Sequence, residues 1–161
     1  MKKLIVVALV MWGLAIVPVS AQEKSTIVVQ PFRLAAGVSW PYDMKQLMTQ
    51  VVAELQNKDA KKYNILVERP AEGSESLALE VEILEWHPGN AAKRALVGMG
   101  TGRETARIRY WLTDQGGKKV FEHEDTVRTE FYASAYAGSV GQLAHPLADK
   151  IGSRLAEAKL N

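Results

Sequence analysis

Residues 103–131 read Arg-Glu-Thr-Ala-Arg-Ile-Arg-Tyr-Trp-Leu-Thr-Asp-Gln-Gly-Gly-Lys-Lys-Val-Phe-Glu-His-Glu-Asp-Thr-Val-Arg-Thr-Glu-Phe, and this stretch decides the fold. From 103 to 114, apolar and polar side chains alternate, which predicts a strand with one buried face. Gly116 and Gly117 mark a tight turn, because glycine tolerates the positive φ that hairpin turns require. The stretch therefore predicts an antiparallel hairpin.

The composition of the two arms also predicts the register of this hairpin. A turn centred on the glycine pair brings apolar residues opposite apolar ones and opposite charges together, as cross-strand energetics favour. The predicted pairs are Leu112 with Phe121, Tyr110 with His123, Ala106 with Val127, Arg109 with Glu124 and Arg103 with Glu130. Asp125 falls on the apolar side, so we expect the second arm to be an edge strand or to contain a bulge.

The strands before the hairpin follow from the same alternation. In 77–86, Leu79, Val81 and Ile83 face one way and Glu80 and Glu82 the other. Two further apolar residues, Leu84 and Trp86, break the pattern, so we expect a bulge or a covered end there. An apolar run at 26–32 predicts a central or doubly covered strand, and 63–68 predicts a short strand.

Two amphipathic helices complete the chain. The first is predicted from about Pro41 to Lys58, with the proline in its first turn. The second is predicted to begin between Gly141 and His145, again with a proline, Pro146, in its first turn. Their apolar stripes consist of Met44, Leu47, Met48, Val51, Val52 and Leu55, and of Leu143, Leu147, Ile151 and Leu155.

Together these elements predict an α+β fold in the order β-α-β-β-β-β-α. We expect a two-layer sandwich with a mostly antiparallel sheet of about five strands and both helices on one face. The charged face of the sheet should be open to solvent or to a partner. Residues 22–161 are expected to form a single domain.

The N-terminus is typical of an export signal. Lys2 and Lys3 precede an apolar run from Leu4 to Val17, which is shorter than the roughly 20 residues of a membrane-spanning helix. The small residues before Gln22 predict cleavage after Ala21, with an uncleaved anchor as the alternative. We therefore expect residues 1–21 to be a cleavable signal peptide and the protein to be periplasmic, with secretion as a further possibility.

Charge and cysteine content exclude several kinds of function. All 18 acidic residues lie after the signal, and two of the 20 basic residues lie within it, so the mature chain is formally neutral. A neutral chain lacks the basic field that nucleic-acid binding requires. The sequence contains no cysteine, which excludes disulfides, thiolate zinc sites, a cysteine nucleophile and a lipid anchor on a cysteine.

Residues 91–102 form the segment where binding is most expected. The connection from His87 to Gly102 is about 16 residues long, and connections of that length are often functional. Its glycines lead into a strand rather than a helix, so it is not a phosphate-binding loop. Packing on the protein's own sheet and contact with a partner or a membrane surface are the open alternatives. The candidate interaction residues are Arg94, Leu96, Val97, Gly98, Met99, Gly100 and Gly102, together with Trp111 on the adjoining strand.

The sequence offers no convincing catalytic, metal-binding or cofactor-binding motif. In His123-Glu124-Asp125, neighbouring strand residues point to opposite faces, so only His123 and Asp125 can converge. The hypothesis of a small periplasmic hydrolase assigns the chemistry to polar residues near His123 and Asp125. No serine lies in a nucleophile elbow.

The run Arg94-Ala-Leu-Val-Gly-Met-Gly-Thr-Gly102, followed by a strand that ends Leu112-Thr-Asp114 and by a glycine turn, resembles the bacterial domain-of-unknown-function 4410 family. Members of that family are exported envelope proteins, many of them lipoproteins. Their layout is similar to the small α+β domains of curli-secretion and peptidoglycan-synthase-activator lipoproteins. The resemblance implies a periplasmic, non-catalytic role and supplies no catalytic residues.

The leading hypothesis from sequence is a non-catalytic periplasmic module that binds or assembles with another envelope protein. A homo-oligomeric envelope scaffold and a small hydrolase are the alternatives. No cofactor is expected.

Overall fold

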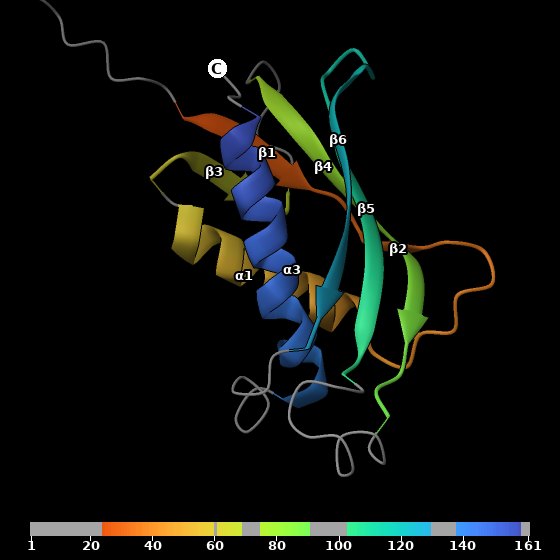
Figure 1. Cartoon of the computed structure of the whole chain (residues 1–161). Coiled ribbons are helices and arrows are strands. Elements are labelled where there is room, and N and C mark those ends of the chain that lie inside the picture. Colours follow the sequence, from red (N-terminus) through yellow and green to blue (C-terminus); the bar gives the residue numbers. More distant parts are fainter. Residues whose placement is uncertain (1–23, 60, 69–74, 91–102, 130–137, 159–161) are drawn as a thin grey trace, which may run out of the picture.

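The computed structural model describes residues 24–59, 61–68, 75–90, 103–129 and 138–158. The strands are β1 (Ser25–Val29), β2 (Arg33–Leu34), β3 (Tyr63–Leu66), β4 (Ser76–His87), β5 (Thr105–Thr113) and β6 (Lys119–Arg128). The helices are α1 (Met44–Asp59) and α3 (Gly138–Glu157). Figure 1 shows the two helices packed in front of one twisted sheet, which confirms the predicted α+β class.

The sheet has the strand order β3-β1-β4-β5-β6, so β1 is a central strand, as its apolar run predicted. It differs from the expected sheet in two ways: the described residues form six strands, because β2 adds to β4, and the sheet is mixed rather than mostly antiparallel. β3 and β4 both run parallel to β1, whereas β4, β5 and β6 are antiparallel to one another. The physical reason is the α1 crossover between β1 and β3, since parallel strands need such a connection.

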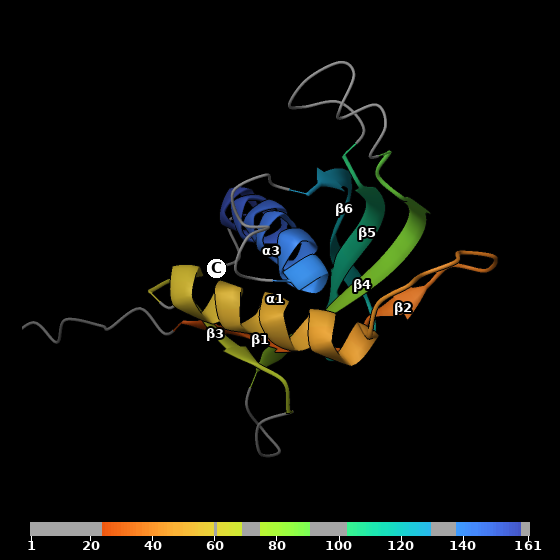
Figure 2. The ribbon, with the colours of Figure 1, turned by 90° about the horizontal axis from the view of Figure 1, so that it is seen from below.

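Both helices cover the same face of the sheet. Figure 2 shows α1 against β1 and β3, and α3 against the β4-β5-β6 side, both within the concave side of the sheet. The predicted apolar sets of the strands and helices meet there in one core. Its most completely buried side chains include Leu47, Leu55, Leu79, Ile83, Ile108, Tyr110, Leu112, Leu143, Leu147, Ile151 and Leu155.

The hairpin register is confirmed. Leu112 faces Phe121, Tyr110 faces His123, Ala106 faces Val127 and Arg109 faces Glu124. The remaining predicted pair includes Glu130, which lies outside the described residues. β6 is an edge strand, as Asp125 predicted, and the register shifts between Ile83 and Glu85, where a bulge was expected.

The first helix begins later than predicted. It starts at Met44, so Pro41 precedes it instead of lying in its first turn. The reason is a side-chain cap: Asp43 Oδ1 accepts a hydrogen bond of 2.8 Å from the backbone N–H of Gln46. An aspartate that satisfies a free N–H of the first turn is a favoured helix start.

The last helix begins earlier than predicted, at Gly138, so Pro146 lies within it. Val140 is only 8% exposed and extends the buried stripe of the helix by one turn beyond Leu143. The free energy gained by burying this extra turn exceeds the cost of the one backbone hydrogen bond that Pro146 removes from the helix.

The two helices lie close together at Gly152. A β-carbon at this position would lie 2.5 Å from Oδ2 of Asp59, a residue at the end of α1 that is only 8% exposed. Real β-carbons do not come this close to another atom, so an alanine at this position would force the Asp59 side chain or one of the helices to shift.

We predict that Gly152→Ala destabilises the protein by about 1–3 kcal/mol in urea unfolding, because overpacking exceeds the gain of about 1 kcal/mol in helix propensity. Ser153→Ala, on the exposed side of the same turn, should change stability by no more than about 0.5 kcal/mol. In a double-mutant cycle, Asp59→Ala should remove most of the cost of Gly152→Ala. A Gly152→Ala variant at least as stable as the wild type would refute the steric explanation.

Candidate interaction surface

The predicted interaction residues divide into two groups. Trp111 lies in β5, on the face of the sheet that no described helix covers. The others, Arg94, Leu96, Val97, Gly98, Met99, Gly100 and Gly102, lie outside the described residues, as do Ala21 and Gln22. Their roles therefore stay predictions.

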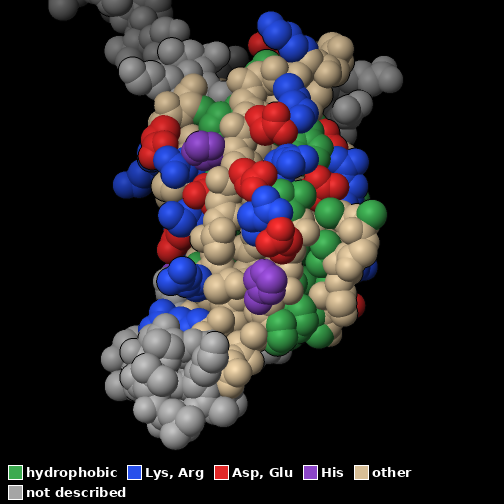
Figure 3. Space-filling view, turned by 45° about the vertical axis from the view of Figure 1, so that its right-hand side comes forward, with side chains coloured by type: hydrophobic (Ala, Val, Ile, Leu, Met, Phe, Trp, Pro, Cys, Tyr) green, Lys and Arg blue, Asp and Glu red, His purple; other side chains and the backbone are tan. Residues whose placement is uncertain are grey.

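The helix-free side of β2, β4, β5 and β6, here called the open face, carries charges of both signs. Figure 3 shows acidic and basic side chains intermingled across it. β4 contributes acidic residues and β5 basic ones, and the middle of β6 is acidic again. The charged residues of the open face include Arg33, Glu80, Glu82, Glu85, Arg107, Arg109, Lys119, Glu122 and Glu124.

Each arginine of β5 bridges the two strands beside it. Arg107 pairs with Glu85 of β4 and, at 2.6 Å, with Glu124 of β6. Arg109 lies 3.8 Å from Glu82 and 3.5 Å from Glu124. The hydrogen bond from Arg107 lowers the pKa of Glu85, and the bond to Glu85 raises the pKa of Arg107. The side chains are solvated, so the pairs order the surface more than they stabilise the fold.

Among the described residues, Trp111 is the large aromatic residue of the open face, and it is only 9% exposed. Its Nε1 donates a 3.1 Å hydrogen bond to Glu80. The guanidinium of Arg33 lies 5.2 Å from the ring centroid and the ammonium of Lys119 lies 4.8 Å from it, both within cation–π range. A partner could therefore reach this ring only if one of these side chains moved.

A cluster of aromatic rings lies where β4 ends and β5 begins, and is here called the aromatic end: Trp40, Tyr42, Trp86 and the carboxylate of Glu104. The three ring centroids are 5.3–6.4 Å apart with nearly perpendicular planes. Glu104, which is 9% exposed, accepts hydrogen bonds from the Tyr42 hydroxyl at 2.8 Å and from Trp86 Nε1 at 2.5 Å. Edge-to-face rings around a satisfied carboxylate make a rigid unit.

The aromatic end fixes both ends of the β4–β5 connection. Trp86 is the second-last residue of β4, and Glu104 immediately precedes β5. The backbone N–H of Thr129, just after β6, donates a 3.0 Å hydrogen bond to the backbone oxygen of Glu104. Sequence reasoning missed this cluster. The sequence contained one signal of it: Glu104 lies two residues before Ala106 and so continues the two-residue period of the buried β5 side chains, which point inward.

We predict that Glu104→Ala lowers the free energy of unfolding by about 2 kcal/mol or more. The change removes the acceptor of two half-buried donors, Tyr42 and Trp86, and the loss of an acceptor costs up to about 1–3 kcal/mol for each. Glu104→Gln keeps one acceptor oxygen and should cost about half as much. Urea unfolding followed by tryptophan fluorescence measures both. Equal stability of the alanine variant and the wild type would show that the carboxylate does not hold the cluster together.

The hydrolase hypothesis depended on His123 and Asp125, and both point to the helix side of β6. Asp125 accepts a 2.8 Å hydrogen bond from the Tyr110 hydroxyl and one of 3.4 Å from Arg154 Nε of α3. The ring of His123 packs instead against Tyr110 and Phe121, at centroid distances of 6.2 and 5.9 Å. Among the described residues no hydrogen bond joins His123 to Asp125. In this arrangement the aspartate ties α3 to the edge strand.

Charge and burial act in opposite directions on Asp125. Burial by itself raises the pKa of the carboxyl, but the hydrogen bonds from Tyr110 and Arg154, with the charges of Arg154 and Lys150, lower it further than burial raises it. The net pKa is therefore below the usual range. Burial, together with the bond to Asp125, raises the pKa of Tyr110.

This arrangement predicts a pH-dependent stability. Because the pKa of Asp125 is lower in the folded than in the unfolded protein, its ionised carboxylate stabilises the fold at pH values above the unfolded pKa of about 3.9. That stabilisation is lost as the pH falls through the folded-state pKa. At pH 7 the free energy of unfolding of the wild type should exceed that of Asp125→Asn by about 1–3 kcal/mol. This difference in stability should shrink below about pH 4. Unfolding curves from pH 7 to 2.5 test this. Glu122→Gln, on the exposed side of β6, is the control, and a difference that does not change with pH would contradict the assignment.

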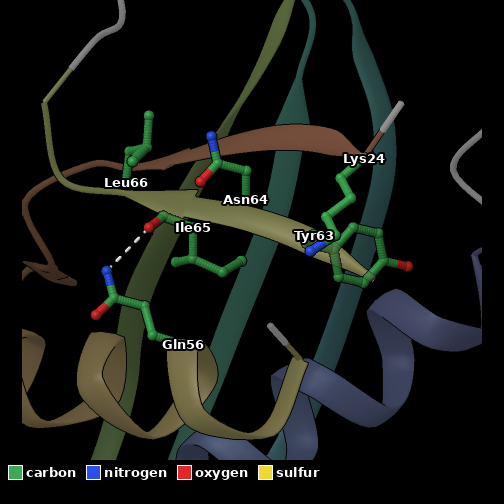
Figure 4. Close-up of a pocket in the computed structure, with 6 residues that line it drawn as sticks. All are labelled: Lys24, Gln56, Tyr63, Asn64, Ile65 and Leu66. Atoms are coloured by element: carbon green, nitrogen blue, oxygen red, sulfur yellow. Dashed lines mark hydrogen bonds between the residues drawn. The ribbon is translucent and has the colours of Figure 1, made fainter. Parts of the chain in front are cut away.

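A shallow hollow of about 620 Å³ lies beside β3, at the opposite edge of the sheet. Figure 4 shows Gln56 of α1 below β3, with its amide donating a 2.9 Å hydrogen bond to the Ile65 carbonyl, while Asn64 and Leu66 point away from the helix. The lining residues are Lys24, Gln56, Tyr63, Asn64, Ile65 and Leu66. The hollow is open to solvent and contains no acid–base pair, so it gives no support for catalysis.

The described residues offer neither a metal site nor a membrane-spanning helix. They contain no group of three or more histidine, aspartate or glutamate side chains placed to hold a metal ion. Neither α1 nor α3 has the length and apolar character that crossing a bilayer requires.

The fold and its surface define a small α+β domain with one helix-covered and one charged, open sheet face. The model of the domain of unknown function DUF4410 matches residues 41–133, which is more than half of the chain, and the chain belongs to this family. This confirms the family resemblance found in residues 94–114. The similarity in layout to curli-secretion and synthase-activator domains stays a prediction. No curated protein matches the sequence.

Several solved structures share the fold at low sequence identity. Hypothetical protein CT253 from Chlamydia trachomatis is 12% identical, with a TM-score of 0.59 over 86% of this chain and 100% of that chain. A PelC dodecamer from Paraburkholderia phytofirmans is 12% identical, with a TM-score of 0.53 over 80% and 87%. Protein XCC0632 from Xanthomonas campestris is 12% identical, with a TM-score of 0.51 over 88% and 89%. Likeness at this level of identity concerns the fold alone.

Proposed function

We propose that this protein is a non-catalytic module of the bacterial periplasm that binds or assembles with an envelope protein. The contact is made by residues 91–102 and the adjoining open face. Export follows from the signal-like residues 1–21, with cleavage between Ala21 and Gln22.

The observation that carries the proposal is the aromatic end. Long connections that serve in recognition need a rigid base, because ordering the ends in advance lowers the entropic cost of binding. Glu104 holds Trp86 and Tyr42 at 2.5 and 2.8 Å, directly beside the residues that lead into and out of 91–102.

Self-assembly is the second candidate, and two observations favour it. The mature chain is formally neutral, and a protein without net charge has little self-repulsion to prevent association. One protein with this fold, PelC, was solved as a dodecamer. Under this alternative, the partner is another copy of the same chain.

The main test is capture of a partner from a bacterial envelope extract with tagged protein. We predict that Leu96→Asp/Val97→Asp reduces recovery of the partner at least tenfold, because two carboxylates would have to be desolvated in the contact. The control is Val67→Asp, which introduces a carboxylate at a described position that is 48% exposed and lies just after β3, away from the open face. Partner recovery that is unchanged by the first pair would remove residues 91–102 from the binding surface.

A further inference from the structure

One row of the open face has an unusual order of charges. The strand registers place Arg33 of β2 beside Glu82 of β4, Glu82 beside Arg109 of β5, and Arg109 beside Glu124 of β6. Across four neighbouring strands the signs therefore alternate as plus, minus, plus, minus. In the row below, Glu85 of β4 lies beside Arg107 of β5, which repeats the central minus–plus pair.

A row with this order is complementary to itself. If a second copy faces the first across a two-fold axis parallel to the strands, between β4 and β5, the order of its columns is reversed. Arg33 then faces Glu124 of the second copy, and Glu82 faces Arg109, each at the same height along the strands. An axis perpendicular to the strands would instead place each column over the same column, so that like charges meet. The pattern thus selects one orientation.

We propose that the open face is the site at which two copies of this chain associate, through the row formed by Arg33, Glu82, Arg109 and Glu124. Such a contact is isologous, because each pair of residues occurs twice in it. The inference rests on the proposed assembly function and names its partner as a second copy. A partner of another kind would need a surface with the complementary order of charges. A second copy of this chain has that order already.

The geometry also indicates the strength of the contact. Four strands about 4.8 Å apart and about six residues long give a footprint of about 19 by 20 Å, which is smaller than the roughly 800 Å² per partner of a stable complex. The arginines are 41–54% exposed and already pair within the chain, so each intermolecular pair adds little. In β6 the acidic residues of the open face lie only in the middle of the strand, because Lys119 and Arg128 place positive charges near its two ends. We therefore expect a weak dimer that dissociates in high salt.

The test is sedimentation velocity at several concentrations, with protein expressed from the full sequence and purified from the periplasmic fraction. Two charge-reversed variants are compared: Arg107→Glu/Arg109→Glu and Glu82→Arg/Glu85→Arg. Each variant alone should remain monomeric, because each presents like charges to its own copy. An equal mixture should associate at least as well as the wild type, because the acidic β5 of one variant faces the basic β4 of the other. Circular dichroism verifies that each variant is folded.

Two further samples sharpen the result. The chain with all four substitutions has inverted columns and should again dimerise by itself. Lys45→Glu/Lys61→Glu, which makes the same charge change at exposed positions away from the open face, should leave dimerisation unchanged. Dimerisation of the wild type that 0.5 M salt abolishes would support the proposal, with the mixing result as its specific sign.

The proposal would be overturned by a wild type that stays monomeric at every concentration, or by a mixture that fails to associate while the wild type does. Neither result would refute the proposed function if the chain still captures an envelope partner that Leu96→Asp/Val97→Asp loses. The converse can also be observed. Leu96→Asp/Val97→Asp leaves the charged row intact, so this variant can lose partner capture and still dimerise.

Discussion

The alternation of side chains along β5 is the constraint on which the rest of the structure depends. Ala106, Ile108, Tyr110 and Leu112 are all at most 2% exposed and meet the helices, while Arg107 and Arg109 point to solvent. Because the side-chain period of a strand is two residues, a slip of one residue would reverse both faces at once. The register of β4 and β6 against β5 therefore fixes the core and the charged face together.

Two carboxylates, those of Glu104 and Asp125, lie on the inward side of this arrangement, and each holds neighbouring elements in place. Glu104 connects β4, β5 and the segment before α1 through Trp86 and Tyr42. Asp125 connects the edge strand to α3 through Arg154. Both carboxylates accept two hydrogen bonds from side chains far apart in the sequence, which is what makes a buried carboxylate tolerable.

The open face follows a different principle. Its side chains are solvated, and its order comes from register, since Arg109 reaches Glu82 and Glu124 only because the three strands are aligned at that height. The same alignment includes Arg33, because β2 adds to β4 where β1 has ended. The strand registers thereby arrange these surface charges in an order of alternating sign across β2, β4, β5 and β6.

The amino-acid sequence by itself determined the elements that depend on local periodicity and turn chemistry. These are the hairpin and its register, the bulge after Ile83, the edge position of β6, and the two apolar helix stripes. The starts of the helices were predicted less well, because a side-chain cap at Asp43 and the burial of Val140 decided them. For the candidate site, the sequence identified Trp111 and the long connection, but not Trp40, Tyr42, Trp86 or Glu104 as a group.

Only the tertiary structure decided which strands are parallel and which distant residues meet. Alternation records which side of a strand is buried, but it contains no information on strand direction or on the order of strands in a sheet. The parallel pairing of β1 with β3 and β4, the attachment of β2, the four-charge row and the cluster around Glu104 all join residues far apart along the chain. Such contacts depend on how the whole core closes, which no short stretch of sequence encodes.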